Sequence, residues 1–354
     1  MINTKEITGE WILQTAKRYK ADPLLTEKVI HALLLLEELV KHTLPFVFKG
    51  GTALMLHFNS EKRLSIDIDI IFSDREIDIE QTLQAIVDEK VFIRFELNER
   101  SKRSNIEKAH YKLFYSPKRD VKEEEEFILL DILYEDVHYS NVVKLPIQSD
   151  FLPQQGEPLL VDVPTIENLL GDKLTAFAPK TTGIPYLKGS DNQSMEIIKQ
   201  LYDIGTLFDI VEDFNSVKET FRKFAVTELA YRDFDEKDID MVLEDIYQTS
   251  LSICTRGMDG DSDFKLLQDG INRITGYIFS ESYYIDKAIN HASKAAYLAT
   301  LLKHDADSFE RFDPSINMKD WVIEQPFNTR VNKLKKSDPE AFFYWYKMYE
   351  MSKR

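Results

Sequence analysis

Two aspartates separated by one residue, Asp67 and Asp69, are the side chains of this 354-residue chain that point most clearly to chemistry. They lie in an alternating segment over residues 66–72, in which isoleucines occupy the intervening positions. In a strand, residues two apart project to the same face, so the two carboxylates are expected side by side. Neighbouring carboxylates repel each other unless a cation lies between them, and hard divalent ions such as Mg²⁺ prefer oxygen ligands. The alternative is an edge strand with an acidic outer face.

A third acid lies in a second apolar segment. Asp131 is the single charged residue in the run Phe127–Tyr134. An isolated aspartate in an apolar strand is costly unless it is paired or bound to a metal. On a strand beside residues 66–72, it would point at the same ions. The alternative is an aspartate satisfied by an arginine or by backbone N–H groups.

A glycine pair precedes the acidic segment. Gly50 and Gly51 lie in the stretch Lys-Gly-Gly-Thr-Ala-Leu, between the short apolar run 46–48 and an expected helix over 52–58. Glycine lets the backbone approach a ligand closely, and a helix N-terminus offers free N–H groups to a phosphate. A phosphate cradle beside a carboxylate pair is suited to attack on a nucleoside triphosphate. The stretch is neither a P-loop nor a Rossmann fingerprint, and a glycine pair is equally consistent with a tight turn.

The stretch Lys-Gly-Gly-Thr-Ala-Leu, the pattern Arg-x-Ser-x-Asp-x-Asp from Arg63 to Asp69, and the strand aspartate Asp131 occur in this order. This combination resembles the nucleotidyltransferase fold of the DNA polymerase β superfamily. More narrowly, it resembles the AbiEii/AbiGii toxin family, which includes MenT-type toxins. The resemblance extends over about residues 46–210 and implies a nucleotidyltransferase that uses an NTP.

Two later motifs of that family also have counterparts in this chain. The first is Glu-Asn-Leu-Leu-Gly-Asp-Lys-Leu-Thr-Ala over residues 167–176, which contains Lys173. The second is Lys-Gln-Leu-Tyr-Asp-Ile over residues 199–204, in which Gln200 replaces the family's first acid and Asp203 is retained. An arginine often found between these motifs has no clear counterpart, and Lys180 or Lys188 are the available substitutes.

The acidic residues themselves predict the metal roles given below, and the resemblance implies the roles of Lys173 and Asp203. Asp67 and Asp69 are expected to bind two Mg²⁺ ions, with Mn²⁺ as an alternative, and Asp131 is expected to bind the ion that activates the acceptor hydroxyl. Lys173 would neutralise the triphosphate, and Asp203 would orient Lys173 or the base. Outside the motif context, Lys173 is consistent with an ordinary solvated helix lysine.

Further residues are predicted to bind the nucleotide. Ser65 and the N–H groups of Gly50, Gly51 and Thr52 are expected to hold the β- and γ-phosphates. Arg63 has two interpretations, a phosphate clamp or a structural ion pair.

The elements that position these residues indicate an α+β fold. The first part predicts helices over 12–19, 23–42, 52–58 and 79–89, and strands over 66–72, 91–97, 110–115 and 127–134. Beyond residue 164, helices are predicted over 165–178, 194–210, 216–231, 236–251, 264–278, 283–302 and 339–351, with a polar loop over 180–194. We therefore expect a nucleotidyltransferase-fold domain with a mixed β-sheet over 1–164 and a mostly α-helical domain over 165–354 that carries Lys173 and Asp203.

The composition and the spacing of single residue types exclude several other classes of protein and site. The single cysteine, Cys254, excludes an internal disulfide, and it lies in no nucleophile motif. The histidines show no zinc-hydrolase spacing. The N-terminus is polar without an apolar signal region, and the longest apolar stretch, over 29–40, is too short to span a bilayer. These features predict a cytoplasmic protein with no membrane partner.

The charge distribution bears on the acceptor. The net charge of −16 disfavours binding to nucleic acid. The segment Glu99–Lys122, however, has a local charge of +5 and includes aromatic residues. That segment is either an RNA-facing surface or a solvated charged hairpin. A C-terminal aromatic block over 342–349 favours a terminal helix docked on the core over base stacking or antitoxin contact.

The predicted function is that of a Mg²⁺-dependent nucleotidyltransferase toxin from a toxin–antitoxin or abortive-infection system. By resemblance it would transfer NMP from NTP to RNA, at the 3′ end of tRNA, and block translation, and a cognate antitoxin would be its protein partner. One alternative is nucleotidylation of a protein or small molecule, as in antibiotic-inactivating enzymes. Another is a regulatory module that binds nucleotide without transferring it.

Overall fold

The structure is a computed structural model of residues 1–354. It describes the chain apart from residues 59–62, 75–76, 99–107, 121, 123, 233, 236–237, 258–262 and 354. The chain divides into two units, Met1–Thr165 with Gly276–Ser282, and Ile166–Thr275 with Tyr283–Arg354. The first unit is therefore discontinuous in sequence.

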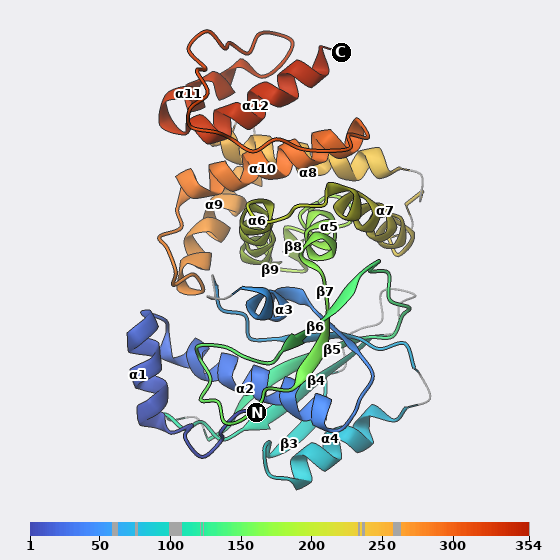
Figure 1. The fold of residues 1–354 in the computed structure, drawn as a ribbon, viewed down its shortest axis with the longest axis vertical. Coiled ribbons are helices and arrows are strands. Elements are labelled where there is room, and N and C mark those ends of the chain that lie inside the picture. The colour runs from blue at the N-terminus through green and yellow to red at the C-terminus, as the bar shows by residue number, and fades with distance from the viewer. Residues whose placement is uncertain are drawn as a thin grey trace. The chain divides into compact units, whose positions relative to one another are not determined.

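The first unit combines helices with a β-sheet (Figure 1). In chain order it contains α1 (Gly9–Tyr19), α2 (Pro23–Lys41), β1 (Val47–Lys49), α3 (Gly50–His57), β2 (Ile68–Ile71), α4 (Ile79–Asp88), β3 (Arg94–Leu97), β4 (Lys108–Tyr115), β5 (Glu126–Leu133), β6 (Val142–Pro146) and β7 (Leu160–Pro164).

Five of these strands form one mixed sheet, in the order β1-β2-β5-β4-β3. The central pair β2 and β5 is parallel, and each of the other neighbouring pairs is antiparallel. The predicted α+β fold with a mixed sheet is confirmed. The hairpin of β6 and β7 was not predicted, because each strand is only five residues long and ends in a proline, which weakens a strand prediction.

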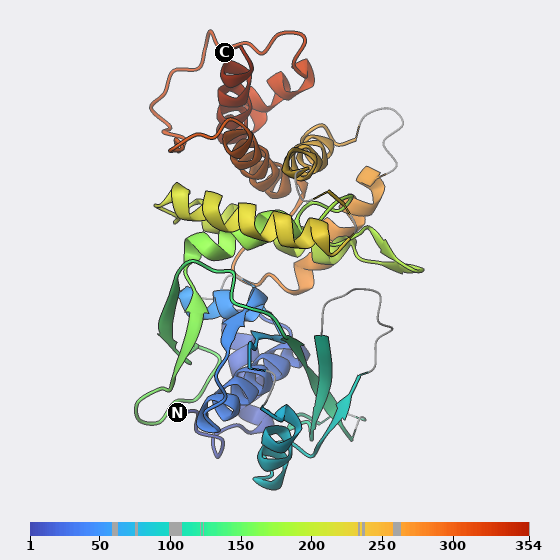
Figure 2. The ribbon, with the colours of Figure 1, turned by 90° about the vertical axis from the view of Figure 1, so that its right-hand side faces the viewer.

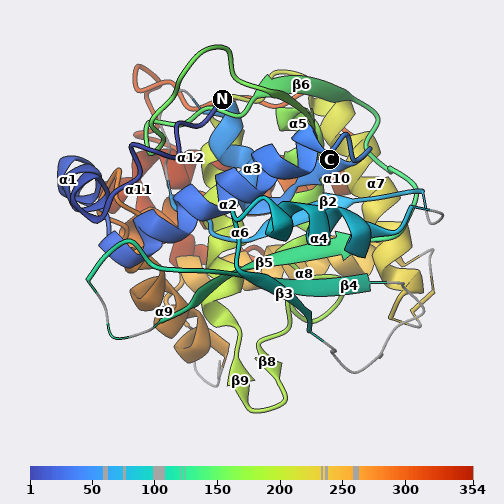
Figure 3. The same ribbon diagram turned by 90° about the horizontal axis from the view of Figure 1, so that it is seen from below.

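One face of the sheet forms the core of the first unit. The helices α2 and α4 contribute to this core together with the sheet, as Figure 3 shows from below. Asp22 caps α2 by accepting a hydrogen bond from the Leu25 N–H, and Asp78 caps α4 in the same way. Ile68, Ile70 and their neighbours on β5 are buried in this core. The residues between them therefore project to the opposite face.

Several predicted element boundaries differ from the structure by a few residues, and the clearest differences are at the strand over 66–72 and the helix over 264–278. The strand predicted over 66–72 is the shorter β2, and Asp67 precedes it. The helix predicted over 264–278 ends at Arg273 and is followed by a 3₁₀ turn at Ile274–Gly276. The physical reason for the second difference is a long-range pairing, since the Leu64 N–H donates to the Tyr277 carbonyl at 2.8 Å.

The second unit is mostly helical (Figure 2). It contains α5 (Ile166–Ala176), β8 (Leu187–Lys188), β9 (Asp191–Asn192), α6 (Ser194–Phe208), α7 (Phe214–Ala230), α8 (Ile239–Cys254), α9 (Asp263–Arg273), α10 (Ile285–Lys303), α11 (Leu334–Ser337) and α12 (Pro339–Ser352). The central helix α10 packs against α6, α8 and α12, and α5 packs against α6 and α7. The loop predicted over 180–194 includes the short hairpin of β8 and β9.

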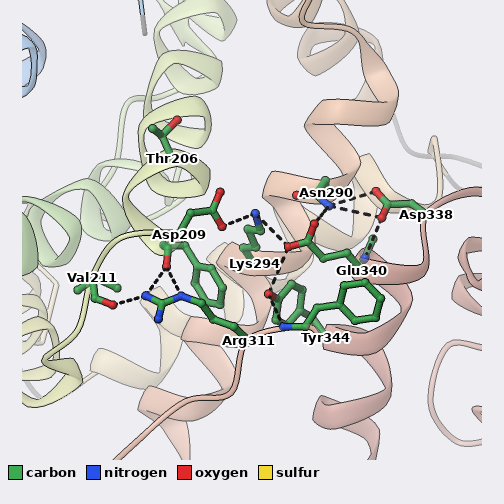
Figure 4. Close-up of polar contacts among 12 residues, drawn as sticks. Thr206, Asp209, Val211, Asn290, Lys294, Arg311, Asp338, Glu340 and Tyr344 are labelled. Atoms are coloured by element: carbon green, nitrogen blue, oxygen red, sulfur yellow. Dashed lines mark hydrogen bonds and ion pairs between the residues drawn. The ribbon is translucent and has the colours of Figure 1, made fainter. Parts of the chain in front are cut away.

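The C-terminal aromatic block belongs to the core of the second unit. The aromatic residues of α12 from Phe342 to Trp345 are buried, and the Trp345 Nε1–H donates to Ser293 Oγ at 2.9 Å. Figure 4 shows polar contacts beside this helix, in which Lys294 pairs with Asp209 at 2.7 Å and with Glu340 at 3.2 Å. The favoured prediction of a docked terminal helix is confirmed.

Among the described residues, no helix combines the length and the apolar character needed to cross a membrane.

Candidate active site

A row of four polar residues crosses the sheet of the first unit. Lys49 on β1 is the register partner of Asp69 on β2, Asp69 is the partner of Asp131 on β5, and Asp131 is the partner of His110 on β4. Directly opposed residues on neighbouring strands lie on the same face, with Cβ atoms about 5 Å apart. Two of the predicted acids are therefore neighbours on the face opposite the core.

His110 contacts the acid of β5 directly. Its Nδ1 lies 2.6 Å from Asp131 Oδ1, and the two side chains are 16% and 30% exposed. This hydrogen bond fixes the orientation of a carboxylate that remains accessible. Sequence reasoning missed His110, because only the register between β4 and β5 brings it beside Asp131.

Asp67 is held at the start of β2 through its backbone. The Thr52 hydroxyl donates to the Asp67 carbonyl at 2.6 Å, and Thr52 is fully buried in α3. The segment before β2 is thus fastened to the first turn of α3. The role of the Asp67 side chain as a partner of Asp69 stays a prediction.

The two glycines lie against the predicted site residues. Gly50 has a φ of +81°, and a Cβ added there would lie 2.2 Å from Asp69 Oδ2. A Cβ on Gly51 would lie 2.7 Å from both Arg63 Nη2 and Ser65 Oγ. Residues predicted from two separate motifs are therefore in close proximity. Gly50 is favoured by both its positive φ and the nearby Asp69 carboxylate, whereas a side chain at Gly51 would have to displace Arg63 and Ser65.

The N-terminus of α3 adds backbone donors to this group. Its N-cap residue Lys49 supplies no side-chain cap, so the N–H groups of the first turn are oriented toward an incoming acceptor. The partial positive charge of a helix N-terminus favours a phosphate there. Arg63 is buried, and its Nη1 donates to the Leu64 carbonyl at 3.2 Å. The role of Arg63 as a phosphate clamp stays a prediction.

We expect the substitution Gly50→Ala to lower nucleotide transfer about 100-fold, because displacement of a reacting group by about 1 Å can cost that much. The added methyl group would displace the Asp69 carboxylate. The positive φ would also cost about 1–2 kcal/mol of folding stability.

Gly156→Ala is the matched control for this substitution. Gly156 has a φ of +70°, but among the described residues no atom other than those of its chain neighbours lies within 4 Å of its added Cβ. It should lose similar stability, measured by denaturant unfolding, and retain activity. Equal activity losses in the two variants would contradict a role for the Gly50–Asp69 contact.

We expect His110→Leu to lower transfer about 10–100-fold, the usual effect of removing a side chain that orients a metal ligand. Asn at this position places an amide donor close to where Nδ1 lies, so His110→Asn should recover most of the loss. The measurement is initial rate at saturating NTP for both variants. Equal rates in the Leu and Asn variants would argue against positioning by this hydrogen bond.

The two predicted residues of the second unit contact each other. Lys173 Nζ lies 3.1 Å from Asp203 Oδ2, and both side chains are buried. Lys173 also donates to Gln200 Oε1 at 2.9 Å. Gln200, which replaces the family's first acid, therefore contacts the same lysine as Asp203. The function of this pair toward a triphosphate stays a prediction.

The basic segment Glu99–Lys122 is only partly described, since residues 99–107 and 121 lie outside the described residues. Arg119 Nε lies 2.6 Å from Glu27 Oε2, and Glu27 is fully buried. The positive charge of Arg119 is thus neutralised by an ion pair inside the fold. Lys108 and Lys112 flank His110 two residues away on β4, so they share its face of the sheet.

Other candidate groups are accounted for by their surroundings. Burial raises the pKa of the Cys254 thiol to about 12, so a reactive thiolate does not form at neutral pH. Burial lowers the pKa of His31 to about 4, and this ring stacks on Tyr115 at 3.7 Å. Lys180 pairs with Asp263 at 2.7 Å, and Lys188 lies in the exposed strand β8.

A known protein family matches the part of the chain that carries these motifs. The family model described as "Nucleotidyl transferase AbiEii toxin, Type IV TA system" matches residues 34–274. No curated protein matches the chain.

Three solved structures are similar to the chain. JHP933 from Helicobacter pylori is 15% identical and covers 84% of this chain and 94% of its own, with a TM-score of 0.41. MenT4, a nucleotidyltransferase toxin from Mycobacterium tuberculosis, is 14% identical. The match covers 82% of this chain and 98% of MenT4, with a TM-score of 0.46. An antigenic nucleotidyltransferase-like protein from Paracoccidioides brasiliensis is 14% identical. The match covers 58% of this chain and 89% of that protein, with a TM-score of 0.36.

Proposed function

This chain belongs to the AbiEii family of nucleotidyltransferase toxins, and we propose that it transfers NMP from an NTP to the 3′ end of tRNA and so blocks translation. Membership of this family implies an NTP donor and a cognate antitoxin. The observation that carries the proposal is the register pair of Asp69 and Asp131, with Gly50 packed against Asp69.

The residues present fit a divalent cation. Asp69 and Asp131 offer carboxylate oxygens at neighbouring positions, and the Asp131 side chain is partly exposed. Hard divalent ions such as Mg²⁺, or Mn²⁺ in its place, take such oxygens as ligands. When bound, two ions would neutralise charge on the attacking and leaving oxygens of an in-line displacement. We propose that Asp67, Asp69 and Asp131 hold them.

The chain's own residues supply the remaining functions. The N–H groups of Gly50, Gly51 and Thr52, together with Ser65, would bind the β- and γ-phosphates and orient them for departure. Asp131 would accept the proton of the acceptor hydroxyl, with His110 keeping its carboxylate in position. Lys173 would neutralise the triphosphate, and Asp203 would orient it.

An RNA acceptor is supported by the charge beside the carboxylates. Lys108, His110 and Lys112 alternate along the site face of β4, and Lys112 Nζ lies 4.8 Å from the centroid of the Phe127 ring. Cations interleaved with aromatic rings suit a nucleic acid backbone and its bases.

Membership of the toxin family supports a proposal for the cellular setting. We propose that the enzyme acts in the cytoplasm, where tRNA and NTP are available, and that it serves abortive infection against phage. Its cognate antitoxin would neutralise this activity.

The test is transfer of label from each α-³²P-labelled NTP, with Mg²⁺, to total RNA and to added protein. We expect label in RNA of tRNA size, lost after treatment that trims the tRNA 3′ end. Label in protein instead would favour the first alternative. NTP binding without any labelled product would favour the regulatory module and overturn the proposal.

A further inference from the structure

Two helices of the first unit end beside each other, away from the row of carboxylates on the sheet. His42 is the C-cap residue of α2, and Glu89 is the C-cap residue of α4. His42 Nε2 lies 3.4 Å from Glu89 Oε1. Glu38 lies four residues before His42, one turn earlier on the same helix face. One ligand atom from each of these three residues lies within 4.8 Å of the other two.

Glu38 brings a buried oxygen to this group. The residue is 2% exposed, and its Oε1 accepts from Lys41 Nζ at 2.7 Å. Its Oε2 is fully buried and has no hydrogen-bond partner among the residues that the structure describes. An unsatisfied buried acceptor is unfavourable, and either a bound cation or an ordered water would satisfy it.

The local charge balance also favours a cation. Glu37 is buried beside Glu38, and its Oε1 lies 3.1 Å from the same Lys41 ammonium. Two buried carboxylates thus share one lysine. Both helices end here, and the partial negative charge at a helix C-terminus attracts cations. With Glu89 included, the group carries more negative charge than Lys41 can balance.

We propose that Glu38, His42 and Glu89 form a second metal site, distinct from the carboxylates of the sheet, which binds Zn²⁺ and joins the ends of α2 and α4. One imidazole with two carboxylates is a donor set that suits Zn²⁺ better than Mg²⁺. Tetrahedral Zn²⁺ with bonds of about 2.1 Å separates its ligand atoms by about 3.4 Å. The His42–Glu89 distance already has this value.

The test is Zn²⁺ titration of the full chain carrying Asp69→Asn and Asp131→Asn, which removes the metal ligands proposed on the sheet. Competition with a chromophoric chelator gives affinity and stoichiometry, and thermal unfolding gives the stabilisation. We expect one equivalent of Zn²⁺ and a rise in melting temperature. Adding His42→Gln, or separately Glu89→Gln, should weaken binding at least about tenfold, since even indirect changes around metal ligands cost this much.

The matched control is His304→Gln, because His304 is the exposed C-cap residue of α10. It should leave Zn²⁺ binding unchanged. Glu89 is 55% exposed in its side chain, so Glu89→Gln tests the site with little risk to folding. Absence of Zn²⁺ binding, or equal binding in the His42, Glu89 and His304 variants, would overturn the proposal. Neither outcome bears on transfer by the carboxylates of the sheet, which is assayed separately.

Discussion

The variant Asp69→Asn is expected to lose nucleotide transfer by about 10³-fold while keeping its fold. Asp69 occupies the centre of the polar row, with Lys49 and Asp131 as its register partners and Gly50 against its carboxylate. Loss of one charged metal ligand removes several kcal/mol of transition-state stabilisation, and 1.4 kcal/mol corresponds to a factor of ten in rate. The measurement is initial rate with labelled NTP and RNA.

Asp162→Asn is the matched control. Asp162 lies in the strand β7 of the same unit and pairs with Lys144 at 2.9 Å in an exposed position. Such surface ion pairs contribute about 0–1 kcal/mol, so this variant should match the wild type in both stability and rate. Transfer that persists in Asp69→Asn would remove the sheet carboxylates from the catalytic machinery.

Lys173→Met is expected to lower transfer about 100-fold or more and to destabilise the fold. The substitution leaves Asp203 buried without its 3.1 Å partner, and breaking a buried ion pair in this way costs about 3–5 kcal/mol. If Lys173 binds the triphosphate as we propose, its loss would add a separate loss in rate. The single variant therefore does not separate the two effects.

The double variant Lys173→Met/Asp203→Leu separates them. Apolar replacement of both members of a buried pair is often neutral for stability, so melting should return toward the wild-type temperature. Transfer should stay low. Lys294→Met is a further control, because Lys294 is also a buried lysine with acidic partners in the second unit. The Lys294→Met variant should be less stable than the wild type, but its rate of nucleotide transfer per folded molecule should be unchanged. Recovery of transfer in the double variant would assign Lys173 a purely structural role.

Local patterns were sufficient to predict the main features of the first unit. The alternation around Asp69 predicted a strand with an apolar core face, and the single acid in the run Phe127–Tyr134 predicted a second such strand. The structure places these strands as parallel neighbours in register. These predictions were possible because apolar residues two apart determine which face is buried.

Features that depend on pairing between distant segments were not predictable. His110 has no local motif, and only the antiparallel register of β4 and β5 brings it to Asp131. The segment near Tyr277 has helical periodicity, but its carbonyl accepts from Leu64, more than two hundred residues earlier. The Glu38–His42–Glu89 group likewise depends on two helices ending at one place. Tertiary contacts of this kind override local propensity.

The most direct test of the central claim is the location of metal ions in the first unit. Crystals grown with Mn²⁺ and a non-hydrolysable NTP analogue would report the metal positions by anomalous scattering. We predict two Mn²⁺ peaks within bonding distance of the Asp67, Asp69 and Asp131 carboxylates, with the triphosphate at Gly50 and Gly51. Triphosphate and metal bound elsewhere, with Asp69 and Asp131 contacting neither, would contradict the proposed active site.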